Sequence, residues 1–158
     1  MTIQVLFLGL GGFPAGILAD RFGSRVVLMA YFAGLVIVSV WLYFSTTFIM
    51  AAIGLGFLGL ITGLYHPAGL KIVSHLPNVS RYMSYHGVAG SLGLAAGPVY
   101  GYWMANWLGW RVAYLIPGAL ALLGLLFLTT LHHEAVIRNK SFKLKFTLTW
   151  AQIIIFSV

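Results

Sequence analysis

Two histidines and a tyrosine are the side chains best suited to proton chemistry in this 158-residue chain. Tyr65 and His66 directly precede Pro67 within a long apolar stretch, and His86 stands in the next stretch. Histidine exchanges protons near neutral pH, and an ionisable group deep in an apolar segment is a functional candidate by default. These residues therefore predict a proton or substrate pathway. The alternative is a neutral histidine that is hydrogen-bonded to a neighbouring helix.

A short charged turn is the second group of residues that could take part in chemistry. Asp20, Arg21 and Arg25 stand between apolar runs, with Gly16 and Gly23 around them. Gly16 allows close packing at the end of the first run, and Gly23 permits a sharp reversal. We expect Asp20 to cap a helix or to pair locally with Arg21 or Arg25. Without a gating role, the same residues would serve as a topology-setting loop.

The composition identifies the elements that must position these groups. Apolar residues make up 61% of the chain and charged residues 7%, far from the values of soluble domains. The bilayer must therefore be part of the solvent, and backbone groups in lipid must be paired within each segment. This predicts an all-α fold, a polytopic transmembrane helix bundle. The two acids, Asp20 and Glu134, lie in predicted loops, so we expect no enzyme activity, no cofactor and no metal site.

Five full spans and the start of a sixth are predicted, because a span needs roughly 20 mainly apolar residues. Short loops between them indicate antiparallel neighbours. We expect residues 1–131 to form the spans, 132–145 a basic connector and 146–158 the start of the next helix. The predicted spans cover residues 2–19, 26–44, 48–73, 83–106 and 111–131.

Basic residues collect on one side of the predicted membrane. If the Asp20 turn is cytoplasmic, the Arg81 and Lys140 loops are cytoplasmic too, and Arg111 alone stands opposite. The positive-inside rule favours this orientation in the inner membrane. The net charge of +7 thus has a topological explanation, and we expect no nucleic-acid partner. The opposite side carries the residues of an interfacial aromatic belt, Trp41, Trp103, Trp107 and Trp110.

Glycines and prolines shape two of the spans. Pro67 cannot donate to the carbonyl of Gly63, so a kink is expected there. Gly93, Gly97 and Gly101 recur every four residues and predict a flat strip for tight helix packing. If the two neighbouring spans pack through their glycine faces, His66 and His86 would approach each other.

These motifs resemble those of one transporter family. The turn from Gly16 to Arg25 resembles the loop between the second and third helices of major facilitator superfamily transporters, although Ser24 replaces a usual basic residue. Gly93, Gly97, Pro98 and Gly101 resemble the family's antiporter motif, with Tyr102 in place of its last glycine. The string Tyr65-His66-Pro67-Ala68 is similar to the fosmidomycin-resistance-type branch of drug efflux proteins.

The resemblance implies a partial major facilitator fold. Residues 2–131 would be the second to sixth helices, so the partners would include a missing first helix and a missing C-terminal half. It also implies that Asp20, Arg21 and Arg25 act as a cytoplasmic gate, and that the substrate site lies between the halves.

The expected function is proton-coupled export of small organic or drug-like molecules by alternating access. One alternative is import of sugars, organic acids or anions by the same fold. The other is a membrane scaffold that transports nothing.

Overall fold

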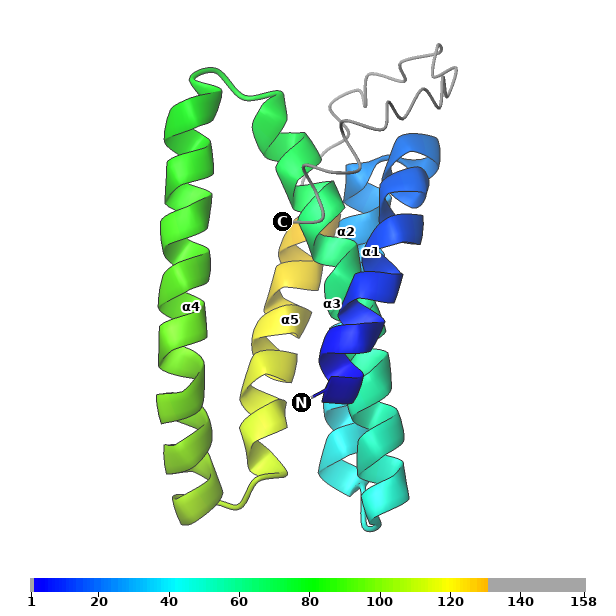
Figure 1. Cartoon of the computed structure of the whole chain (residues 1–158), viewed down its shortest axis with the longest axis vertical. Coiled ribbons are helices and arrows are strands. Elements are labelled where there is room, and N and C mark those ends of the chain that lie inside the picture. Colours follow the sequence, from blue (N-terminus) through cyan, green and yellow to red (C-terminus); the bar gives the residue numbers. More distant parts are fainter. Residues whose placement is uncertain (1, 131–158) are drawn as a thin grey trace, which may run out of the picture.

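The protein is an all-α bundle over residues 2–130, the part that the computed structural model describes, and this part contains no strand. The predicted fold class is therefore confirmed. The helices run alternately up and down, so that consecutive helices are antiparallel (Figure 1). The predicted connector and the start of the next helix, with Lys140 and Glu134, lie outside the described residues. The helices are α1 (Thr2–Phe22), α2 (Ser24–Phe44), α3 (Phe48–Ser74), α4 (Val79–Trp107) and α5 (Val112–Thr130).

Four of these helices, α1, α2, α3 and α5, are long and apolar enough to cross a membrane. The exception is α4, which contains the span expected at residues 83–106. Its 29 residues would rise about 43 Å, so it has ample length. It carries polar side chains such as Arg81, Ser84 and His86, which lower its apolar character. Polar groups at membrane depth normally face protein or a water-filled cavity, so α4 is the helix least suited to lipid on all sides.

The charged turn is much shorter than predicted. α1 continues through Asp20 and Arg21 to Phe22, and α2 begins at Ser24, so only Gly23 lies between the helices. Its φ of 90° falls in the region that glycine adopts without steric cost. The predicted helix boundaries at residues 19 and 26 are therefore wrong. One glycine reverses the chain, while the long charged side chains can remain on helix ends and still extend toward polar surroundings.

The tightest packing joins α1 and α3 through glycines. A Cβ atom added to Gly63 would lie 2.7 Å from the carbonyl oxygen of Leu8, and one added to Gly59 would collide with the Gln4 carbonyl oxygen. Gly11 approaches the backbone of Leu60 in the same way. The glycine face of α3 therefore meets α1 and not α4. The condition under which His66 and His86 would approach each other, packing of α3 and α4 through their glycine faces, is therefore not met in residues 2–130.

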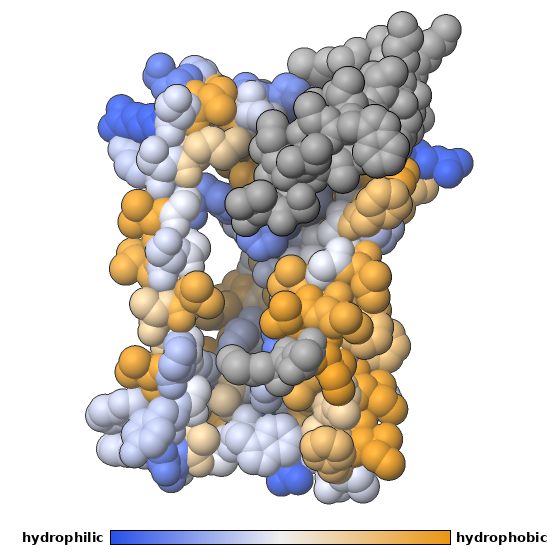
Figure 2. Space-filling view, viewed as in Figure 1, coloured by the Kyte–Doolittle hydropathy of each residue, from blue (hydrophilic) through white to orange (hydrophobic). Residues whose placement is uncertain are grey.

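α4 makes few contacts with the other helices and has no buried residue, although Tyr100 Oη donates to the Ala113 carbonyl oxygen at 2.7 Å, next to the start of α5. Figure 2 shows open space between the column that α4 forms and the rest of the bundle. No atom of the described residues lies within 4 Å of a Cβ placed on Gly93, Gly97 or Gly101. The predicted packing strip is thus uncovered within residues 2–130. Gly16, also expected to pack closely, has the same open surroundings.

Candidate functional site

The up-and-down topology gives the bundle two chemically different ends. The α1–α2 turn and the α3–α4 loop lie together at the top of Figure 1, and the α2–α3 and α4–α5 turns lie together at the bottom. We call the first the basic end, because it holds Asp20, Arg21, Arg25, Lys71 and Arg81. We call the second the tryptophan end. It holds Trp41, Trp103, Trp107, Trp110 and Arg111.

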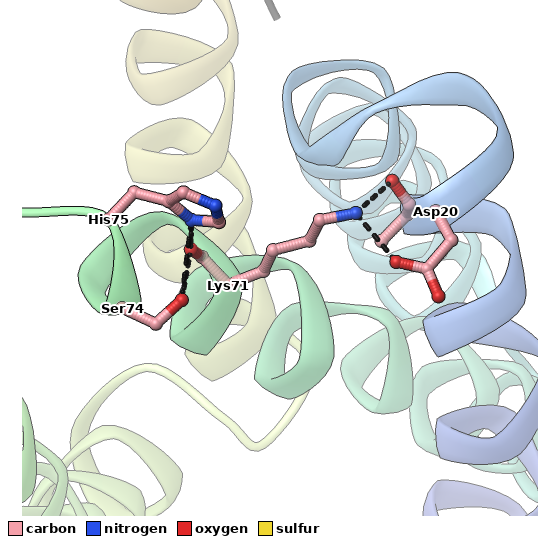
Figure 3. A network of polar contacts seen from close by, with 5 residues as sticks. Asp20, Lys71, Ser74 and His75 are labelled. Carbon is pink, nitrogen blue, oxygen red and sulfur yellow. Dashed lines mark hydrogen bonds and ion pairs between the residues drawn. The ribbon is translucent and has the colours of Figure 1, made fainter. Parts of the chain in front are cut away.

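Asp20 pairs with a residue from a different helix. Lys71 Nζ of α3 lies 2.6 Å from Asp20 Oδ1 and also donates to the Ala19 carbonyl oxygen at 3.0 Å (Figure 3). The side chains of Lys71 and Asp20 are 36% and 48% exposed. Local pairing with Arg21 or Arg25 was expected, but α1 and α3 both end here, side by side. The flexible stem of Lys71 spans the gap between them.

The two arginines of the turn make other contacts. The Arg21 guanidinium lies over the ring of its neighbour Phe22, 5.5 Å from the ring centroid. Arg25 Nη2 donates to the Leu128 carbonyl oxygen at 2.6 Å. Arg25 therefore links the start of α2 to the last turn of α5, whereas Arg21 keeps to its own helix end.

Polar side chains also form hydrogen bonds at the C-terminal end of α3. Ser74 Oγ donates to the Lys71 carbonyl oxygen at 2.8 Å, and His75 Nδ1 lies 2.6 Å from the same oxygen. A carbonyl oxygen only accepts, so Nδ1 must carry the proton of this hydrogen bond. Figure 3 shows both side chains turned toward that carbonyl. The sequence patterns marked neither Lys71 nor His75 as a site residue.

A cluster of aromatic and imidazole rings joins α2, α3 and α4. The Tyr65 ring stacks on His86 with centroids 5.8 Å apart, meets His66 edge-on at 5.7 Å, and lies 5.3 Å from Tyr31. Tyr65 and His86 are half-buried, and His66 is exposed. The two histidines were expected to approach each other; instead, each contacts Tyr65. We call these four residues the tyrosine–histidine cluster.

The cluster combines several chemical abilities in one place. A phenol can donate or accept a hydrogen bond, and a neutral imidazole can do both at once. Flat rings also offer faces on which another ring can stack. Within residues 2–130, no group of three histidine, cysteine or acidic side chains could hold a metal ion. The phenols and imidazoles of the cluster thus offer hydrogen-bond donors, hydrogen-bond acceptors and ring faces.

Comparison with known proteins identifies the family. The model of the Major Facilitator Superfamily matches residues 1–157. The chain belongs to this superfamily. The resemblance seen in the motifs is thus confirmed at the level of the superfamily. No curated protein matches the sequence.

Membership in this superfamily indicates the role of the five helices. Major facilitator proteins are multi-pass membrane transporters of small molecules, so α1 to α5 form part of a transporter in a lipid bilayer. In this superfamily, substrates bind near the bilayer midplane, where repeats meet. The tyrosine–histidine cluster joins α3 to α4, and the Asp20–Lys71 pair lies at the basic end.

Proposed function

We propose that this superfamily member belongs to a proton-coupled secondary transporter that exports small organic or drug-like molecules by alternating access. In this proposal, the basic end lies in the cytoplasm and the protein sits in the inner membrane. α1 to α5 correspond to the second to sixth helices of the family. A first helix and a C-terminal half complete the transporter.

The observation that carries the proposal is the ring contact between Tyr65 and His86. It joins α3 to α4, and α4 has no buried residue of its own. A charge added to His86 or His66 changes the environment of Tyr65 and thus the interaction between these helices. The cluster therefore supports a site at which proton binding and helix position depend on each other.

The Asp20–Lys71 pair supports a gate at the basic end. Both side chains are partly exposed, and exposed ion pairs contribute only about 0–1 kcal/mol to stability. Such a contact can form and break during a transport cycle at little energetic cost. Asp20, Arg21 and Arg25 remain the gate residues of this proposal, and Lys71 joins them.

Export is favoured by the glycine–proline pattern of α4. Pro98 removes one backbone hydrogen bond within the helix, and Gly97 and Gly101 beside it have open space around them. α4 can therefore bend at this point without a clash against the described residues. The family's antiporters carry a similar pattern, which is why we propose an exporter. The string Tyr65-His66-Pro67-Ala68 supports the fosmidomycin-resistance-type branch.

Gradient-driven flux in vesicles tests the proposal. The chain is reconstituted alone and together with a complementary first helix and C-terminal half, and proton-driven export is followed. We expect flux only from the combination. The His66→Gln and His86→Gln variants should lose pH-driven transport. The control, His75→Gln, changes a histidine at the exposed end of α3 and should retain it.

Two other outcomes would replace the proposal. Inward flux of sugars, organic acids or anions would make the protein an importer. Absence of flux from every combination would favour a membrane scaffold, a role that the uncovered face of α4 would suit. Unchanged coupling in the His66→Gln variant would remove the histidine from the pathway.

A further inference from the structure

α2 and α5 begin with the same short pattern. Gly23-Ser24-Arg25-Val26 opens α2, and Gly109-Trp110-Arg111-Val112 opens α5. Both glycines have positive φ angles, 90° and 88°. In each case, glycine reverses the chain and an arginine follows at the start of the next helix. The same local arrangement is therefore used twice, once at each end of the bundle.

Each arginine reaches the far end of the other helix. Arg25 Nη2 donates to the Leu128 carbonyl oxygen at 2.6 Å, close to the end of α5. Arg111 Nε donates to the Ser45 carbonyl oxygen at 2.7 Å, directly after α2. The last carbonyls of a helix have no partner within it and carry the negative end of its dipole. A guanidinium supplies both the missing donor and the opposite charge.

α2 and α5 also pack closely against each other between these two ends. A Cβ on Gly118 of α5 would lie 2.6 Å from the Ser39 Cβ of α2. A Cβ on Gly124 would lie 2.9 Å from Cε1 of Phe32. Glycines of α5 thus let α2 approach closely at two levels. Ser39 is buried and Ser45 is 1% exposed, so water has little access to this interface near the tryptophan end.

We infer that Arg25 and Arg111 are paired positioning residues that hold α2 and α5 together as one rigid unit. Arg111 does at the tryptophan end what Arg25 does at the basic end. The rigid unit can be tested without any transport assay. Its role in the cycle, as the fixed frame against which α4 moves, rests on the proposed function.

Thiol labelling of single introduced cysteines tests the rigid unit. The chain contains no cysteine, so two positions can be studied without background. Ser39→Cys, at a buried site of α2 beside Gly118, reports on the tryptophan end. Val27→Cys, in the buried cluster against which Leu128 packs, reports on the basic end. Labelling rates are measured with a membrane-permeant thiol reagent in membranes containing the full chain.

The expected result is specific to each end. Arg111→Met should speed labelling of Ser39→Cys on the order of tenfold, as expected for loss of a charge-assisted hydrogen bond, and affect Val27→Cys much less. Arg25→Met should do the reverse. Arg111→Lys should keep much of the slow labelling, since it retains a cationic donor.

The control is Arg81→Met. Arg81 contacts Tyr85 of its own helix α4, so its loss should leave both rates unchanged. Unchanged rates in Arg111→Met would overturn the inference. Equally faster labelling at both positions in either arginine variant would also overturn it, because that result indicates general unfolding. Neither outcome depends on whether the protein transports anything.

Discussion

Lys71 Nζ binds the Asp20 carboxylate at 2.6 Å and the Ala19 carbonyl oxygen at 3.0 Å. A single cation from α3 therefore neutralises the acid of the charged turn and is a second donor, beside the Gly23 N–H, to the Ala19 carbonyl oxygen. Beneath this contact, Ala19 and Ala68 belong to a buried cluster with Val27 and Leu28. The ion pair thus closes the basic end over an apolar core.

Removal of the Lys71 ammonium should open this end while changing stability little. We expect Lys71→Met to lower the free energy of unfolding by less than about 1 kcal/mol, since the pair is partly exposed. A cysteine introduced at Ala68, which is fully buried, should then react with a thiol reagent several times faster. Arg21→Met is the matched control, and the charge-swapped pair Asp20→Lys with Lys71→Asp should restore slow labelling. Equal labelling in Lys71→Met and the parent would contradict a closing role.

Alanine substitution should lower the stability of the protein at the packed glycines but not at the uncovered ones. Gly59→Ala and Gly63→Ala place a methyl group against the backbone of α1 and should each cost about 1–3 kcal/mol through overpacking. Gly97→Ala meets open space and should be tolerated in the chain alone. Thermal unfolding in detergent measures all three. A loss for Gly97→Ala as large as that for Gly63→Ala would show that α4 packs differently.

The reversal at Gly109 should depend on backbone conformation alone. Its φ is 88°, and no atom of residues 2–130 other than those of its chain neighbours lies within 4 Å of an added Cβ. Gly109→Ala should therefore cost about 1–2 kcal/mol of backbone strain without any steric clash. Gly9→Ala, in open space within α1, is the control and should be neutral or slightly stabilising. The two unfolding midpoints should differ by several degrees, and equal midpoints would contradict strain at Gly109.

Thiol labelling from one side of the membrane should establish the orientation. Cysteines at Ser24 and Asn78 report on the basic end, and cysteines at Thr46 and Leu108 report on the tryptophan end. The positive-inside rule predicts that an impermeant reagent reaches the first two only from the cytoplasm. The second two should react only from the opposite side. Labelling of Ser24→Cys from outside intact cells would reverse the proposed topology.

Hydropathy and loop chemistry were enough to predict the five helices of residues 2–130 and their antiparallel order. A bilayer requires each crossing segment to be apolar and to pair its own backbone groups, and both requirements can be read locally. The ends of the helices were less accurate. α1 and α2 extend into the predicted turn, since one residue with positive φ, Gly23, is sufficient for the reversal.

The partners of the side chains could not be predicted from local patterns. The glycine spacing of α3 and α4 indicated two packing faces, but not that Gly63 meets α1 while Gly97 meets no described residue. Lys71 was visible as a basic residue, yet its contact with Asp20 depends on how α3 is rotated beside α1.

The sequence by itself determined the superfamily, the helices and the turn glycine Gly23, because these depend on residue type and near neighbours. The tertiary structure decided that Tyr65 lies between His66 and His86, and that Arg25 and Arg111 reach opposite helix ends. Such contacts join residues far apart in the chain. They depend on the rotation and spacing of whole helices, which no local pattern specifies.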